Sequence, residues 1–127
     1  MPRRSIFPNP DNKPAGFSPA TRVGSLVFVS GQVSVDASGN LVGEGDCQAQ
    51  AEQVLDNVEA ALKAAGVTMS DVAKITAFLI NDTDYAAYAS VRSMRFLAPG
   101  PASSTVFVKG LVNPKFLIEI EAIAVAS

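Results

Sequence analysis

The alternation of apolar and polar positions near the end of the chain predicts two β-strands. Over residues 104–109 the side chains alternate between two sets from one residue to the next, which is the two-residue period of a strand with two different faces. Gly110 and the Asn113-Pro114 pair interrupt this pattern. It resumes over residues 117–125, where aliphatic side chains occupy the even positions. We interpret this closing stretch as a β-hairpin or a broader antiparallel pair.

Two carboxylates lie on the other predicted face of the last strand. Glu119 and Glu121 share the odd positions with three aliphatic side chains, Leu117, Ile123 and Val125. An ionised carboxylate is destabilised by burial unless it has a partner, and burial raises its pKa. This face therefore implies a partner, a water-lined cleft or a subunit boundary. The alternative is that both glutamates are solvated on an open face of the sheet.

Two segments have the helical period. Apolar residues recur at helical spacing between Asp46, a predicted N-cap, and Gly66, a predicted residue just after the helix. A second helix is predicted over residues 85–96, after the capping residues 81–84. Arg92 is the only charged member of its predicted inward stripe. The stripe consists of Tyr85, Tyr88, Ala89, Arg92 and Phe96.

The remaining segments complete a pattern of two strands, helix, strand, helix and two strands. Residues 17–23, 26–29 and 73–80 are predicted strands, and residues 33–45 form a loop or small hairpin. Four prolines predict an irregular or extended arm over residues 1–16. This order predicts one domain spanning residues 1–127, an α+β sandwich with both helices on one face of a mixed sheet. Because the other face keeps Leu117, Ile123 and Val125, we expect other subunits to cover it.

Composition excludes several classes of site. The chain has no histidine and one cysteine, so zinc sites and Ser-His or Cys-His nucleophile pairs are not expected. We expect Cys47 to be a small, half-buried residue near a helix start. The net charge is −2 and the basic residues are scattered, so we do not expect a nucleic-acid partner. No apolar run suggests a signal peptide or a membrane span, and a cytoplasmic protein is expected.

Several motifs together resemble the Rid family, also called the YjgF or L-PSP endoribonuclease family. They are LVFVSGQVSVDASGNLVGEG, QAEQVLDNVEAALKAAG, DVAKITAFLIND, PASSTV and EIEAIA, in this order from about residue 17 to the end. The resemblance implies a chorismate-mutase-like (ferredoxin-like) sandwich, with two helices on one face of a mixed six-stranded sheet. It also implies a homotrimer with three clefts at the subunit boundaries.

The resemblance further implies hydrolysis of 2-imino acids or their enamine tautomers to 2-keto acids and ammonia, without a metal or organic cofactor. The ligand expected at the subunit interfaces is then a small carboxylate or imine-like molecule. The glutamate of the family's EIEA motif, which positions the attacking water, is matched by Glu119. The arginine of its PARS motif, which binds the substrate carboxylate, is matched by Ser103, and the aromatic residue at the cleft by Phe17. Ser30 and Gly31 are further candidates because their backbone amides lie at a strand end.

The missing arginine leaves the substrate carboxylate without its usual partner. A serine hydroxyl donates one hydrogen bond of about 1 kcal/mol net, whereas hydrogen bonds to charged groups contribute about 1.5–3 kcal/mol. We hypothesise that Arg92, beside Ser103 and Thr105, supplies the positive charge of the missing arginine. The alternative is that Arg92 extends to the surface or pairs structurally with a carboxylate.

Three functions remain open at this stage. The first is an imine or enamine deaminase with an altered substrate, and the second is a non-catalytic protein that binds a small metabolite. The third is ribonuclease activity, which the family's older name suggests. The absence of histidine and of a basic stripe with interleaved aromatics argues against it.

Overall fold

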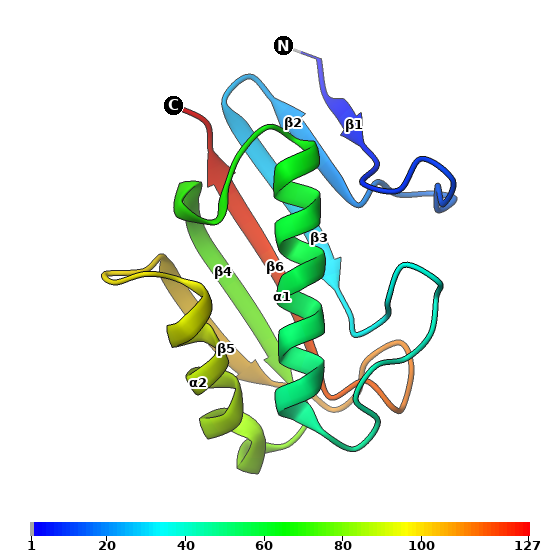
Figure 1. Ribbon diagram of the computed structural model, residues 1–127, viewed down its shortest axis with the longest axis vertical. Coiled ribbons are helices and arrows are strands. Elements are labelled where there is room, and N and C mark those ends of the chain that lie inside the picture. Colours follow the sequence, from blue (N-terminus) through cyan, green and yellow to red (C-terminus); the bar gives the residue numbers. More distant parts are fainter. Residues whose placement is uncertain (1) are drawn as a thin grey trace.

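The computed structural model describes residues 2–127, and it confirms the predicted α+β class, with a mixed six-stranded sheet and two helices. Figure 1 shows both helices lying across the same face of the sheet. The elements are β1 (Arg4–Ile6), β2 (Ala20–Val23), β3 (Leu26–Gln32), α1 (Cys47–Ala64), β4 (Val72–Leu79), α2 (Tyr85–Arg95), β5 (Ala102–Phe107) and β6 (Ile118–Val125). Short 3-10 turns, Met69–Asp71 and Asp82–Asp84, precede β4 and α2.

The closing stretch does not form the predicted hairpin. The strand order is β1-β2-β3-β6-β4-β5, so β4 separates the last two strands. β5 pairs with β4 in parallel, while β6 is antiparallel to both β3 and β4. The alternation in each strand correctly identified its faces, but it carries no information on which strand is its neighbour. Residues 108–117 take the chain past β4 to the centre of the sheet.

The predicted irregular arm contains the short strand β1. Arg4 pairs with Arg22, and Ile6, which is buried, pairs with Ala20. Pro2 and Pro8 lie on either side of this strand, which leaves the residues between them free to pair with the edge of β2. The arm is therefore extended over β1, as one of the two predicted alternatives has it, and its pairing with the sheet was not predicted.

The first helix matches its prediction. The Asp46 side chain accepts a hydrogen bond from the Ala49 backbone nitrogen at 3.2 Å, and Gly66 follows the helix at a φ of +85°. Cys47 begins the helix, as expected, but it is buried rather than half-buried. Desolvation, reinforced by Asp84 and Asp46, raises the pKa of its thiol to about 12. The thiol is therefore neutral near pH 7, in agreement with a structural residue.

The second helix presents a different side to the core than its stripe predicted. Tyr88 and Phe96 are buried as expected, but Val91 is buried too and Tyr85 is 41% exposed. The reason is that α2 packs against α1, which turns Val91 inward and leaves Tyr85 beside β5. No helix within the described residues is long and apolar enough to cross a bilayer.

The face of the sheet away from the helices carries exposed apolar side chains, as predicted for Ile123 and Val125. Leu26 pairs with Val125 and Phe28 with Ile123, so these four lie together on the open face. Leu117 does not belong to this surface. It precedes the first residue of β6 and packs partly buried against the core.

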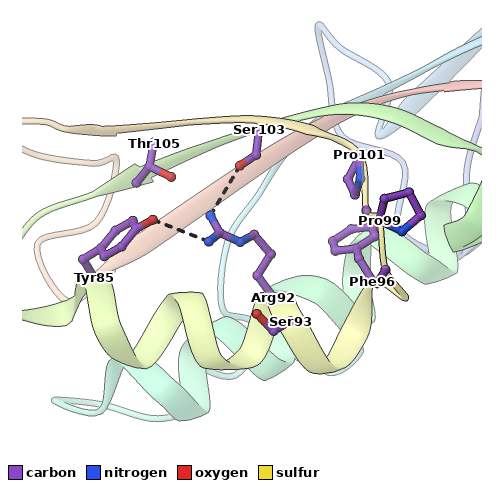
Figure 2. Close-up of a pocket in the computed structure, with 10 residues that line it drawn as sticks. Tyr85, Arg92, Ser93, Phe96, Pro99, Pro101, Ser103 and Thr105 are labelled. Atoms are coloured by element: carbon purple, nitrogen blue, oxygen red, sulfur yellow. Dashed lines mark hydrogen bonds between the residues drawn. The ribbon is translucent and has the colours of Figure 1, made fainter.

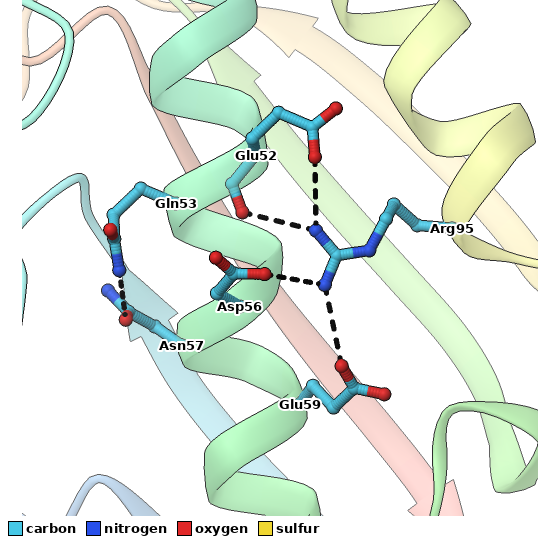
Figure 3. A network of polar contacts seen from close by, with 6 residues as sticks. All are labelled: Glu52, Gln53, Asp56, Asn57, Glu59 and Arg95. Atoms are coloured by element: carbon cyan, nitrogen blue, oxygen red, sulfur yellow. Dashed lines mark hydrogen bonds and ion pairs between the residues drawn. The ribbon is translucent and has the colours of Figure 1, made fainter.

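Arg95 connects the end of α2 to α1 (Figure 3). Its guanidinium contacts three carboxylates of α1, with nitrogen-to-oxygen distances of 2.8 Å to Asp56, 3.3 Å to Glu52 and 3.5 Å to Glu59. It also donates to the Glu52 backbone oxygen at 3.2 Å. A single cation thus offsets the mutual repulsion of three acids and sets the position of α2 on α1.

Gln50 connects the start of α1 to the segment that leads into β6. Its fully buried amide nitrogen donates to the backbone oxygens of Gly43 at 3.1 Å and Lys115 at 3.0 Å. Its amide oxygen accepts from the Leu117 backbone nitrogen at 2.8 Å. Since Glu119 lies two residues farther along, Gln50 fixes how the chain enters the strand that carries this glutamate.

The substitution Gln50→Leu should destabilise the protein by about 2–4 kcal/mol, because it leaves three backbone polar groups without partners while preserving apolar volume. Urea unfolding at a fixed protein concentration measures this loss. The control is Gln48→Leu, an exposed position of the same helix, which should change stability by less than about 0.5 kcal/mol. Equal effects of the two substitutions would contradict the role given to Gln50.

Candidate functional site

The candidate residues form two groups on opposite faces of the sheet. Ser103 and Thr105 of β5 pair with Ile75 and Ala77 of β4, whose buried side chains belong to the core on the helix side. Glu119 lies at an odd position of β6, between the buried residues Ile118 and Ile120, and points to the open face. Because side chains alternate along a strand, one copy of the chain does not bring Ser103 and Glu119 into one cleft.

We call the first set the Arg92 group: Tyr85, Arg92, Ser103 and Thr105. These residues line a cavity of about 680 Å³ between α2, the start of β5 and the turn that joins them (Figure 2). Tyr85 and Arg92 are two helical turns apart on α2, so they lie on the same side of the helix. The other residues that line the cavity are Ser93, Phe96, Ala98, Pro99, Gly100 and Pro101.

Arg92 points toward Ser103, the position that matches the arginine of the PARS motif (Figure 2). Its Nη1 donates to Ser103 Oγ at 3.5 Å and its Nη2 to Tyr85 Oη at 3.4 Å, both long hydrogen bonds. The guanidinium also lies 5.2 Å from the centre of the Tyr88 ring and 5.9 Å from that of Tyr85, within the range of cation–π attraction.

The environment of Arg92 keeps it charged and accessible. The hydrogen bond to Tyr85 is the largest of the effects that raise its pKa above the ordinary value. Within residues 2–127 it forms no ion pair, so the alternative of structural pairing with a carboxylate is not observed. A guanidinium held by aromatic rings and two weak hydrogen bonds retains donors for an anionic ligand.

We call the second set the Glu119 group: Phe17, Ser30, Gly31 and Glu119. The Glu119 side chain lies directly against Gly31, where an added Cβ would be 2.8 Å from its carboxyl carbon. Glycine at this position therefore makes room for the carboxylate. In the part of the chain that the structure describes, no side-chain hydrogen bond or ion pair involves Glu119.

Partial burial is the largest cause that raises the pKa of Glu119, and repulsion by Glu121 adds to it. Glu121 itself is exposed on the same strand face. The two glutamates thus differ in environment. Glu119 is the partly desolvated acid of the open face, while Glu121 is the solvated one.

Ser30 and Phe17 are the other two candidates of this group. Ser30 Oγ donates to the Ser18 backbone oxygen at 2.6 Å, and the Ser30 backbone nitrogen donates to Pro19 at 2.9 Å. Both donors of Ser30 are therefore used within the chain, and its hydroxyl retains only acceptor capacity toward a ligand. Phe17 is 60% exposed and precedes the segment that Ser30 holds.

Of the residues that accompany Arg92 in the cavity, Ser103 and Thr105 were predicted from the sequence as site candidates but the others were not. Tyr85 and Phe96 were predicted as packing residues, and the turn over residues 97–101 only as a helix stop. The seven-residue spacing of Tyr85 and Arg92 was the available signal, since it places both on one side of a helix.

Comparison with known proteins gives consistent results. A family model described as endoribonuclease L-PSP matches residues 10–126. A RutC family protein of Pyrococcus abyssi is 38% identical over 126 residues, which is 98% of each chain. The crystal structure of the YjgF gene product of E. coli has a TM-score of 0.87 at 34% identity, covering 98% of this chain and 99% of that one. The structure of E. coli TdcF with bound serine has a TM-score of 0.86, with the same identity and coverage.

The substitution Glu119→Gln should change how stability depends on pH. Because the pKa of folded Glu119 is above its ordinary value of 4.5, protonated Glu119 favours the folded state. This contribution is fully present below the ordinary pKa and is lost as the pH rises through the raised pKa. The glutamine variant should therefore gain stability relative to wild type as the pH rises from about 4 to about 7.

Urea midpoints at several pH values and one protein concentration provide the measurement. Glu121→Gln should retain the pH dependence but shift it to lower pH, because one source of repulsion on Glu119 is removed. Identical pH profiles for wild type and Glu119→Gln would show that Glu119 is not perturbed.

Proposed function

Because the chain belongs to the endoribonuclease L-PSP family, which is the Rid or YjgF family, we propose that it hydrolyses 2-imino acids or their enamine tautomers to 2-keto acids and ammonia. The observation that carries this proposal is Glu119, a half-buried carboxylate without a partner among the described residues, with a raised pKa and packed directly against Gly31. A carboxylate in such a position is suited to hold a water molecule and accept its proton.

The chemical role of Glu119 follows from its environment. The raised pKa makes the carboxylate a stronger base than a solvated glutamate. It takes a proton from water as the oxygen bonds to the C=N carbon and the C=N π electrons move to nitrogen, and it delivers this proton to the nitrogen, which gives a carbinolamine. Glu119 then moves the hydroxyl proton to the amine nitrogen as the C–N bond breaks, releasing ammonia and leaving the keto group.

The substrate carboxylate binds the Arg92 group. The guanidinium of Arg92 reaches the hydroxyl of Ser103, at the position that matches the family's arginine, but from α2 rather than from β5. Ser103 and Thr105 add hydroxyl donors on the same side of the cavity. This arrangement supports binding of a monoanionic carboxylate, for which a guanidinium is the preferred partner.

A complete site requires two copies of the chain, because the Arg92 and Glu119 groups lie on opposite faces of the sheet. We propose a homotrimer in which each of three clefts combines the Arg92 group of one copy with the Glu119 group of the next. The exposed apolar side chains of the open face support this assembly. The serine bound to the related TdcF supports a small ligand that carries a carboxylate.

A non-catalytic binding protein is the alternative, and the serine at position 103 is the observation that favours it. Binding needs only the Arg92 group, whereas turnover also needs Glu119 to reach the C=N carbon. The two functions therefore differ in their response to substitution of the glutamate.

The assay generates 2-iminopropanoate or a larger 2-imino acid in situ with an amino acid oxidase, and follows its hydrolysis. Wild type should accelerate the reaction, and Glu119→Ala should lose about 100-fold or more of the rate because the general base is gone. Arg92→Gln should lower kcat/KM by about 10- to 150-fold, as the charge-assisted hydrogen bonds to the carboxylate are lost.

Glu121→Ala is the matched control, because it removes a carboxylate from the same strand face, and it should retain most activity. A wild-type protein that is silent while Ser103→Arg gains activity would show that the cleft serves binding alone. Full activity of Glu119→Ala would refute the role of this glutamate in the reaction.

The trimer is tested through the open face. Ile123→Asp places a charge in the centre of the apolar surface and should yield monomers in light scattering after size exclusion, with loss of any hydrolysis. Val112→Asp, at a position that is 94% exposed in a loop, should leave the trimer intact. A monomeric wild-type protein that is fully active would contradict the shared cleft.

A further inference from the structure

The cavity of the Arg92 group is built for more than a small carboxylate. Resting on the proposed function, we infer that its preferred ligands are 2-imino acids with a large apolar side chain, such as those related to leucine or phenylalanine. In this arrangement the carboxylate binds Arg92 and the side chain packs on Phe96, Pro99 and Pro101.

The cavity has a polar end and an apolar end (Figure 2). Tyr85, Arg92, Ser103 and Thr105 gather at one end, with the guanidinium directed to Ser103 and Tyr85. The rings of Phe96, Pro99 and Pro101 gather at the other end, beside the turn between α2 and β5. A ligand that satisfies both ends has an anionic group and an apolar group.

The volume of the cavity agrees with a ligand larger than a three-carbon acid. The cavity measures about 680 Å³, which falls in the range of about 300–1,000 Å³ typical of ligand pockets. The non-hydrogen atoms of 2-iminopropanoate would fill only a small part of it. Serine at position 103 contributes to this space, because a β5 arginine would extend into the volume that the hydroxyl leaves open.

The charge of the lining specifies a monoanion. Arg92 is the one charged residue among those that line the cavity within the described chain. Lys74, on the neighbouring strand β4, donates to Ser104 Oγ at 2.7 Å, and Ser104 lies on the other face of β5. A phosphate or dicarboxylate would therefore leave one negative charge without a partner, whereas a monocarboxylate matches the site.

Binding of stable 2-oxo acids tests this inference without requiring turnover. Isothermal titration would compare pyruvate, 4-methyl-2-oxopentanoate and phenylpyruvate, on wild type and on Glu119→Gln. Each methylene removed from water adds about fourfold in affinity. Since the cavity is open, we expect the two larger acids to bind about tenfold more tightly than pyruvate.

Two substitutions locate the ends of the ligand. Arg92→Gln should abolish binding of all three acids at concentrations that saturate wild type. Ala98→Gln places a neutral polar side chain at the exposed, apolar end and should remove the preference for the large acids while leaving pyruvate unchanged. Its control is Ala86→Gln, an exposed position of α2 outside the cavity lining, which should bind as wild type does.

Equal affinities for the three acids, or a uniform effect of Ala98→Gln on all of them, would overturn the inference. Binding that survives Arg92→Gln would do the same, because the carboxylate would then lie elsewhere. The binding test and the hydrolysis assay of the proposed function can give different outcomes. Size discrimination without hydrolysis would refute the proposed reaction alone, and hydrolysis without size discrimination would refute only the apolar subsite.

Discussion

The side-chain alternation of β6, at the centre of the sheet, is the constraint on which the rest of the structure depends. Burial of Ile118, Ile120, Ala122 and Ala124 against the helices compels the residues between them to face the other way. β6 is hydrogen-bonded on both sides, by β3 and β4, so its register is fixed twice. A slip of one residue would bury both glutamates in the core, which is energetically prohibitive. Glu119 is therefore held on the open face by the same forces that build the core.

The neighbouring strands adapt to this arrangement. β3 is irregular between Val29 and Gln32, and Gly31 lies in this irregular part. Because Gly31 has no side chain, the Glu119 carboxylate occupies the space that a Cβ would take. On the opposite face, the alternation of β5 directs Ser103 and Thr105 toward α2, where the helix supplies Arg92. The position of this helix depends in turn on Arg95 and its three carboxylate partners on α1. The position of Glu119 thus depends on the register of β6, and the position of Arg92 depends on the contacts that hold α2 against α1.

The two halves carry opposite charges that are unpaired within the described part of one copy. Glu119 has no hydrogen-bonding partner and Arg92 no carboxylate partner among these residues. Each charge remains tolerable in the isolated chain because it is only partly buried. Partly buried titratable groups with raised pKa values are frequent at functional sites, which supports the proposal that a ligand and a second copy complete this one. Under the same proposal, Arg92 of α2 supplies the cation in place of the family's arginine, at whose position Ser103 stands.

Local pattern in the sequence determined the first helix with its cap and stop, the faces of β6 and the unusual position of Glu119. The motifs added the family and its fold. Only the tertiary structure decided that β5 joins β4 in parallel, that β1 extends the sheet from the N-terminal arm, and that Arg92 meets Tyr85 and Ser103 around one cavity. The reason is physical: periodicity reports which side of an element is buried, and this is a local property. The choice of a neighbouring strand, and the rotation of α2 that buries Val91, depend on contacts between residues far apart in the chain.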